Sequence, residues 1–167
     1  MVATTETCEF SRLIRLDQIT DATTVITATA EECRSLAKRF ELVALHHLTA
    51  TVRLRRHGPE SVRASGRVAA RWTQNCIVTL EPVDSAFDET FAVTYAAGAG
   101  AQAVLDPSAE DVLELPPDVI DIGELAAQQL GLAIDPYPRA PGAALPELDT
   151  GSPERPFSAL RPAKART

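Results

Sequence analysis

The chain has 167 residues and a formal net charge of −7; apolar types make up 45% of it and aromatic types 5%. A chain of this length folds as one domain and buries about 70% of its unfolded surface, so it needs no metal or disulfide for stability. Three irregularly spaced cysteines exclude a disulfide framework. The sequence shows neither a signal-peptide pattern nor an apolar run long enough to cross a membrane, so we expect a reduced, cytoplasmic protein without membrane contact.

The first part of the chain predicts two strands and then a helix. Residues 9–16 alternate between apolar and polar types, and residues 23–28 are rich in β-branched types, which favours strands. Thr29 and Glu32 have the spacing of a capping box, with Thr29 as the N-cap. Apolar side chains then recur at helical spacing, so residues 30–40 predict an amphipathic helix. These apolar side chains are Cys33, Leu36, Ala37 and Phe40.

A β-hairpin is the clearest pattern in the sequence. Residues 48–56 and 61–72 both alternate with a period of two, and residues 57–60, His-Gly-Pro-Glu, supply the turn. One face of the hairpin is apolar and includes Trp72. The opposite face collects five arginines: Arg53, Arg55, Arg63, Arg67 and Arg71.

The second half of the chain predicts two more strands, a loop and a second helix. Residues 75–81 and 86–95 are typical of strands, and residues 97–111 are small and acidic, as in a loop. Asp121 opens the helix, and Glu124 stands at the spacing of a cap pair with it.

The chain changes character at residue 136, after which proline is frequent. We expect a domain over residues 1–135 and an extended, partly disordered tail over residues 136–167. Phe157 and Leu160 stand one helical turn apart in this tail, and they either anchor it on a partner or pack back on the sheet. The predicted fold is α+β, with a mostly antiparallel, twisted sheet or partial β-barrel of about six strands and two main helices.

The charge is distributed unevenly along the chain. Residues 34–71 carry nine basic residues and two acids, which gives +7. Residues 84–149 carry thirteen acids and one base, which gives −12, and residues 152–167 return to +3. Such asymmetry predicts different partners for different faces, or one half of the chain packing on the other.

The arginine face of the hairpin therefore has three interpretations. Arginine suits phosphate geometry, and five together can supply the backbone contacts that dominate nucleic-acid affinity. The same pattern is also typical of a solvated outer sheet face, or the acidic residues 84–149 cover it. Exposed aromatic side chains for base stacking are missing from this face, because Trp72 alternates onto the apolar side.

Few residues favour catalysis. His46 and His47 are adjacent, so their side chains diverge and rarely share one ion. Cys33 and Cys76 occupy positions that favour core packing. Phosphate-loop, nucleophile-elbow and zinc-protease motifs are absent. We therefore predict no enzyme, no metal site and no cofactor.

Three blocks of the sequence resemble a known family. They are residues 76–82, CIVTLEP; residues 121–142, which include the run Asp135-Pro136-Tyr137-Pro138-Arg139; and residues 156–160, PFSAL. The opening Glu9-Phe10-Ser11-Arg12 and the helix around Glu31-Glu32-Cys33 also fit. Together these blocks resemble the YceD family of large-subunit ribosomal RNA accumulation proteins.

The resemblance implies a non-catalytic role in large-subunit ribosomal RNA accumulation and ribosome assembly, through binding of that RNA or of a ribosomal protein. It adds candidate binding residues to the five arginines: Asp135, Tyr137, Arg139, Phe157 and Leu160. Many relatives carry a Cys-x-x-Cys pair, resembling a zinc site, where this chain has Cys76 and Thr79. Four zinc ligands cannot be assembled from the cysteines of this chain, since residues 77–167 contain none.

Two alternatives to direct RNA binding stay open. One is a protein-binding adaptor that uses its acidic half to hold a basic partner, because opposite charge steers association. The other is an uncharacterised enzyme, which would need a deep pocket with convergent titratable groups. The sequence favours a monomer but does not determine the oligomeric state.

Overall fold

The structure, a computed structural model, describes residues 9–98 and 111–144. It has seven strands and two helices in these ranges, with a short 3-10 turn at Leu16–Gln18. The elements are β1 (Leu13–Arg15), β2 (Thr23–Thr27), α1 (Ala30–Arg39), β3 (Ala44–Arg56), β4 (Ser61–Asn75), β5 (Pro82–Ala96), β6 (Asp111–Glu114), β7 (Val119–Asp121) and α2 (Ile122–Ala133). This arrangement confirms the predicted α+β class.

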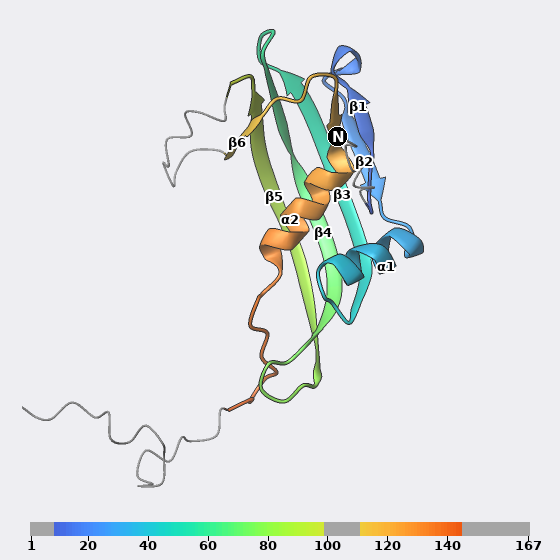
Figure 1. Ribbon diagram of the computed structural model, residues 1–167, viewed down its shortest axis with the longest axis vertical. Coiled ribbons are helices and arrows are strands. Elements are labelled where there is room, and N and C mark those ends of the chain that lie inside the picture. The colour runs from blue at the N-terminus through green and yellow to red at the C-terminus, as the bar shows by residue number, and fades with distance from the viewer. Residues whose placement is uncertain (1–8, 99–110, 145–167) are drawn as a thin grey trace, which may run out of the picture.

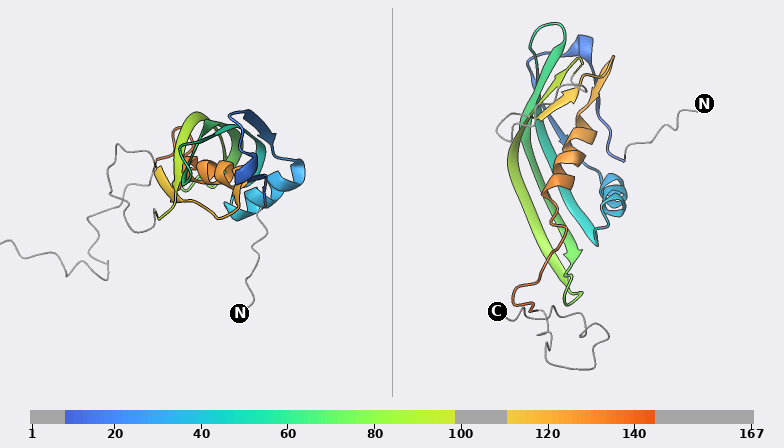
Figure 2. Two further views of the ribbon diagram at one scale, coloured as in Figure 1. Left: turned by 90° about the horizontal axis from the view of Figure 1, so that it is seen from above. Right: turned by 60° about the vertical axis from the view of Figure 1, so that its left-hand side comes forward.

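Five of the strands form one main sheet in the order β2-β3-β4-β5-β6 (Figure 1). All its pairs are antiparallel except β5 with β6, which is parallel. The sheet curls around α2 without closing, so it is a partial barrel with β2 and β6 at its edges (Figure 2). None of the helices in the described ranges has the length and apolar character needed to cross a membrane.

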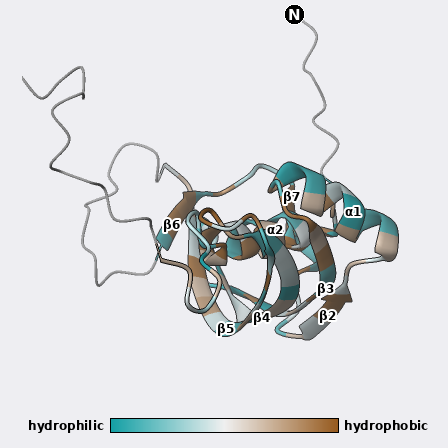
Figure 3. Cartoon of the chain, turned by 90° about the horizontal axis from the view of Figure 1, so that it is seen from below, coloured by the Kyte–Doolittle hydropathy of each residue, from teal (hydrophilic) through white to brown (hydrophobic). Residues whose placement is uncertain are grey.

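The core lies between α2 and the concave face of the sheet (Figure 3). The predicted alternation of the hairpin is confirmed, because one face of β3 and β4 is buried and the arginines lie on the other. The buried residues of these two strands include Leu48, Ala50, Val52, Leu54, Val62, Ala64, Val68, Ala70 and Trp72. From α2, Leu125, Ala126 and Leu130 pack into the same core. Packing in this core holds α2 against the concave face of the sheet, so the convex face stays exposed.

The helix starts follow the predicted caps, with one correction. Thr29 and Glu32 form the capping box of α1. The Asp121 carboxylate accepts hydrogen bonds from the backbone N–H groups of Gly123 and Glu124 at the start of α2. Glu124 does not complete a second capping box, because its carboxylate binds Arg39 through two hydrogen bonds of 2.8 Å. Glu124 therefore joins the two helices.

The N-terminal strand is shorter than predicted and pairs with a strand from the other end of the domain. β1 covers Leu13–Arg15 only and pairs with β7, which the sequence did not indicate. Ser11 Oγ donates to Asp121 over 2.6 Å, and the backbone N–H of Arg12 donates to the same carboxylate over 2.7 Å. The Arg12 guanidinium binds Glu32, which lowers the pKa of that carboxyl group to about 2. These contacts fix the start of the domain to both helices.

Residues 76–81 form a turn and not the strand predicted over residues 75–81, of which only Asn75 belongs to a strand, as the last residue of β4. The backbone N–H of Cys76 donates to Glu81 O over 2.8 Å, and the N–H of Leu80 donates to Cys76 O. Leu80 has a φ of 60°, which is outside the β region. The β-branched residues 77–79 favoured a strand locally, but the turn between the two longest strands prevails. Most of the predicted loop 97–111 lies outside the described residues.

Candidate functional site

The five arginines share the convex face of the sheet, as the alternation predicted. In the β3–β4 register, Arg55 lies opposite Arg63, and His47 lies opposite Arg71. Arg53 and Arg67 lie between these two pairs on the same face. The face therefore runs from the hairpin turn to the far end of β4.

Arg53, Arg55 and Arg67 form ion pairs with described residues. Arg53 and Arg55 both bind Asp21, and their hydrogen bonds lower the pKa of the Asp21 carboxyl group to about 2. Arg67 binds Asp88 with two hydrogen bonds, which lowers the pKa of Asp88. These pairs reduce the positive charge near the hairpin turn and the middle of the face. Residue 88 belongs to the acidic half of the chain, so that half supplies an ion-pair partner to one arginine of the face, which stays exposed.

The far end of the arginine face is different, because Arg71 forms no ion pair with any described residue and is exposed. Its cross-strand neighbour His47 is exposed too, and its imidazole bonds Thr49. His46 reaches the same surface through a bulge in β3. Thr73 Oγ1 donates its one hydrogen to Asp84, so the 2.8 Å bond between Thr73 and His46 is donated by His46 Nε2. This end presents one unpaired cation and two imidazoles.

The turn at residues 76–81 lies just beyond Arg71 along β4, and we call it the tip. Its Cys76 side chain is fully buried, while Leu80 is 76% exposed. The Cys76 thiol accepts hydrogen bonds from the backbone N–H groups of Val78, Thr79 and Ala140, at 3.2–3.4 Å. These donors, with Ala140 first, lower the pKa of the Cys76 thiol to about 6. The thiol thus replaces a turn carbonyl as an acceptor and ties the tip to a distant segment.

Residues 135–144 are that distant segment, and they run from the end of α2 down to the tip (Figure 2). Ile77 donates to Pro138 O over 2.9 Å. Gln74, which is buried, donates to Asp135 O and accepts a hydrogen bond from Trp72 Nε1. These bonds place residues 76–82, one of the blocks that carried the family resemblance, against residues 135–142, the last part of the block 121–142.

The predicted binding residues of this segment have different environments. Asp135 uses its carboxylate internally, because Oδ1 accepts from the Tyr137 backbone N–H over 2.8 Å. Tyr137 is 69% exposed, and Arg139 is exposed as well. Phe157 and Leu160 lie outside the described residues. The structure therefore brings Tyr137 and Arg139 to the tip, and it assigns Asp135 to fixing the segment.

Sequence reasoning missed one residue beside the tip and two residues within it. Gln74 anchors residues 135–144, and Ile77 and Leu80 add exposed apolar surface. Gln74 carried one signal, since it is a polar residue on the inward face of a strand. No local pattern could have indicated Ile77 and Leu80, because their exposure follows from a turn where a strand was predicted.

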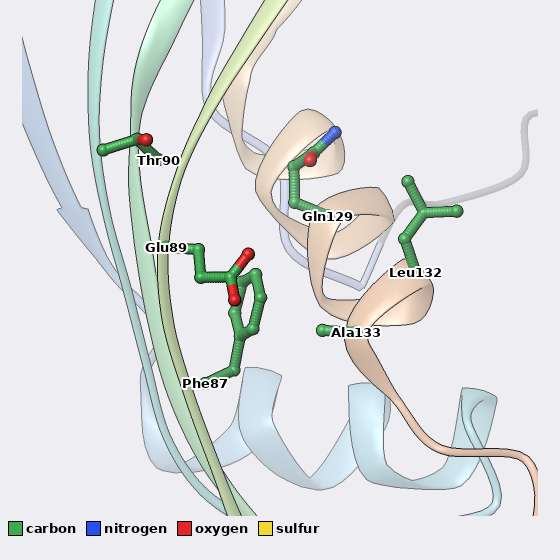
Figure 4. A pocket seen from close by; sticks show the side chains of 6 residues that line it. All are labelled: Phe87, Glu89, Thr90, Gln129, Leu132 and Ala133. Carbon is green, nitrogen blue, oxygen red and sulfur yellow. The ribbon is translucent and has the colours of Figure 1, made fainter. Parts of the chain in front are cut away.

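A groove of about 360 Å³ lies between α2 and the concave side of β5 (Figure 4). It is lined by Phe87, Glu89, Thr90, Gln129, Leu132 and Ala133. Glu89 is the one titratable side chain among these, so the groove lacks the convergent acid and base groups that catalysis would use. Within the described residues, no three His, Cys, Asp or Glu side chains meet as a metal-ligand group.

The thiol of Cys76 should give the stability of the protein a pH dependence. Its folded pKa of about 6 is below the ordinary thiol value of 9.0, so its stabilising effect is complete above pH 9 and is lost as the pH falls through 6. The difference in unfolding free energy between the native protein and Cys76→Ala should therefore grow from pH 5 to pH 9, measured by urea unfolding under reducing conditions.

Cys33→Ala is the matched control, because burial raises the pKa of the Cys33 thiol. A raised pKa keeps the thiol neutral up to pH 9, so the corresponding difference for Cys33→Ala should stay constant over that range. Equal pH profiles for the two variants would show that the backbone donors do not stabilise a Cys76 thiolate.

Comparison with known proteins gave one finding. A family model described as large ribosomal RNA subunit accumulation protein YceD matches residues 64–159. The matched range contains most of β4, the tip, α2 and residues 135–144. The comparison with curated proteins gave no significant match, and neither did the comparison with solved structures.

Proposed function

Because the chain belongs to the YceD family, described as large ribosomal RNA subunit accumulation proteins, we propose that it supports accumulation of that RNA by binding it directly in the cytoplasm. In this proposal the protein is a recognition factor and catalyses no reaction. The binding surface consists of Arg71 with His46 and His47 on the convex face, and Tyr137 with Arg139 at the tip. We call these five residues the RNA surface.

The exposed, unpaired Arg71 is the single observation that carries the assignment to RNA. Its guanidinium has no carboxylate among the described residues to displace, so it can bind a phosphate at full charge. The neighbouring Arg67 is different, because a phosphate would have to compete with Asp88 for it. His46 and His47 add exposed polar side chains beside Arg71.

Tyr137 supplies the aromatic group that the sheet face lacks. Single-stranded RNA is recognised by stacking of its bases on exposed aromatic rings and by cations along its backbone. Tyr137 is 69% exposed, and Arg139 is exposed two residues further on. Asp135 and Pro138 hold this segment against the tip, so the ring is presented from a fixed backbone. The distance from Arg71 to Cys76 along β4 is about 17 Å, which a few nucleotides can span.

A basic ribosomal protein is the second candidate partner. The observation in its favour is the pair of exposed carboxylates at the tip and the start of β5, Glu81 and Asp84. A pull-down from cell extract separates the candidates. RNA binding predicts that nuclease treatment releases the ribosomal material, whereas an adaptor would retain a ribosomal protein after nuclease and lose it in high salt.

The double variant Arg71→Glu/Arg139→Glu should lower the affinity for a large-subunit ribosomal RNA fragment by about tenfold or more at moderate salt. Each lost phosphate contact should also reduce the slope of log K against log salt by about 0.7 to 0.9. Filter binding over a salt series measures both quantities.

Arg15→Glu/Arg34→Glu is the matched control, because these two arginines are exposed on β1 and α1, away from the proposed surface. The control makes the same change in net charge and should keep most of the affinity and the slope. If both double variants lost affinity equally, the binding would depend on net charge alone, and the RNA surface would be wrongly assigned.

A further inference from the structure

We propose that residues 155–161 of this chain bind in the groove between α2 and β5. In this proposal they form one helical turn that places Phe157 and Leu160 against Phe87, Leu132 and Ala133. Residues 155–161 lie outside the described residues, so the groove and the sequence carry the proposal. It is independent of the RNA surface, which lies on the opposite face of the sheet and at the tip.

The groove offers apolar surface that no described residue covers. Leu132 is 77% exposed at its rim, and Phe87 is only partly buried on its β5 side (Figure 4). β6 pairs only with the end of β5, at residues 93–96. Among the described residues, no strand pairs with that edge of β5 over residues 82–92, so the approach to the groove is open. A groove that combines apolar and polar side chains beside an open strand edge suits a short amphipathic segment.

The chain leaves the described structure close enough to reach the groove. The Ala140 N–H bonds Cys76 Sγ over 3.2 Å, and Cys76 in turn bonds Glu81, so the segment passes the start of β5. Phe87 lies about 20 Å from Glu81 along the strand. Residues 145–156 can span about 40 Å when extended, so Phe157 can reach the groove without strain.

The chemistry of residues 155–161 complements that of the groove. The segment reads Arg-Pro-Phe-Ser-Ala-Leu-Arg, so two apolar side chains one helical turn apart are flanked by two cations. Glu89 projects into the groove beside Phe87 and has no ion-pair partner among the described residues. Arg155 or Arg161 would supply that partner. The family match extends to residue 159, so it includes most of this segment.

The covalent connection favours this occupant over a separate molecule. A segment tethered by a short flexible linker has an effective concentration of the order of mM, so even weak apolar contacts keep it bound. A second copy of the chain could instead add its own β5 edge. In that case Glu89 would act as an inward-facing charge that opposes edge pairing, a common protection of open edges.

Nuclear Overhauser contacts in the full-length protein test the proposal. We expect contacts between the Phe157 ring and the methyl groups of Leu132 and Ala133. These contacts should disappear in Phe157→Ala/Leu160→Ala, and the Leu132 and Ala133 methyl shifts should move. Leu148→Ala, which removes an apolar side chain elsewhere in the tail, should leave both the contacts and the shifts unchanged.

Glu89→Lys tests the proposed ion pair with Arg155 or Arg161 and should weaken the contacts. Glu60→Lys, in the hairpin turn, should leave them unchanged. The proposal would be overturned if the native protein showed no such contacts and the Leu132 and Ala133 methyl shifts were unchanged in Phe157→Ala/Leu160→Ala. A sample that mixes two differently labelled preparations provides the second check. Contacts between the two preparations would identify a second copy as the occupant and would overturn the proposal as well.

Discussion

Replacement of Gly66 by alanine is expected to lower the free energy of unfolding by about 3 kcal/mol. A Cβ atom at residue 66 would lie 1.9 Å from the backbone oxygen of Thr51 and 3.1 Å from the Phe91 ring. The first contact is with backbone, so no side-chain rotation can relieve it. β3 and β4 would have to separate at the centre of the sheet, where the hairpin curls around α2.

Urea unfolding followed by circular dichroism measures this effect. Ser65→Ala is the matched control, because residue 65 is the neighbour on the outer face and its side chain does not enter the core. The control should change the unfolding free energy by less than about 0.5 kcal/mol. A Gly66→Ala protein as stable as the control would mean that the two strands are not this close.

Replacement of Asp121 by alanine should lower the unfolding free energy by about 2 to 4 kcal/mol. The Asp121 carboxylate accepts four hydrogen bonds, from the N–H groups of Arg12, Gly123 and Glu124 and from the hydroxyl of Ser11. Alanine would leave these partly buried donors without an acceptor. It would also remove the cap of α2 and detach β1 from β7 at the same point.

Asp121→Asn should recover part of the loss, because its amide oxygen can still cap α2 while its amino group can donate to Ser11. Asp118→Ala is the control, since Asp118 is exposed, precedes β7 and lies outside the cap. Thermal unfolding of the three variants ranks them. The expected order of stability is Asp118→Ala, then Asp121→Asn, then Asp121→Ala.

Local patterns predicted the parts of the fold that local interactions determine. The period of two over β3 and β4 predicted which side chains face the core, since burial on one face leaves no other register. The capping box at Thr29 predicted the start of α1 because both of its hydrogen bonds lie within four residues.

Pairings between distant residues were not predictable in this way. Asp121 joins Ser11 and Arg12 across the whole domain, and no local signal indicates which carboxylate will serve as their acceptor. The strand predicted over residues 75–81 was wrong for the opposite reason, because here a local signal was present and misleading. Their β-branched side chains favour a strand, but the chain must reverse between β4 and β5, and the Cys76 thiol supplies the acceptor that stabilises the reversal.

In the candidate site, too, the local pattern was predictable and the contacts between distant residues were not. Alternation placed all five arginines on one face, but it could not show that Arg53 and Arg55 share Asp21 or that Asp88 binds Arg67. Those ion pairs depend on a turn before β2 and on the β4–β5 register. Their effect is to move the expected RNA contact to Arg71 and towards the tip, where the family-like segment presents Tyr137.

The concave face of the sheet holds the core, and we propose that the convex face and the tip serve recognition. The helix α2 fills the hollow of the sheet, so the core does not depend on Arg71, Tyr137 or Arg139. Variants of these three residues should therefore fold normally, which allows loss of function to be separated from loss of structure.

The ratio of large-subunit to small-subunit ribosomal RNA in cells that lack the protein tests the proposed function most directly. We predict that this ratio falls and that the native gene restores it. Arg15→Glu/Arg34→Glu should restore it equally well, whereas Arg71→Glu/Arg139→Glu should not, although both variants accumulate as folded protein. An unchanged ratio in cells without the protein, or full restoration by Arg71→Glu/Arg139→Glu, would contradict the account.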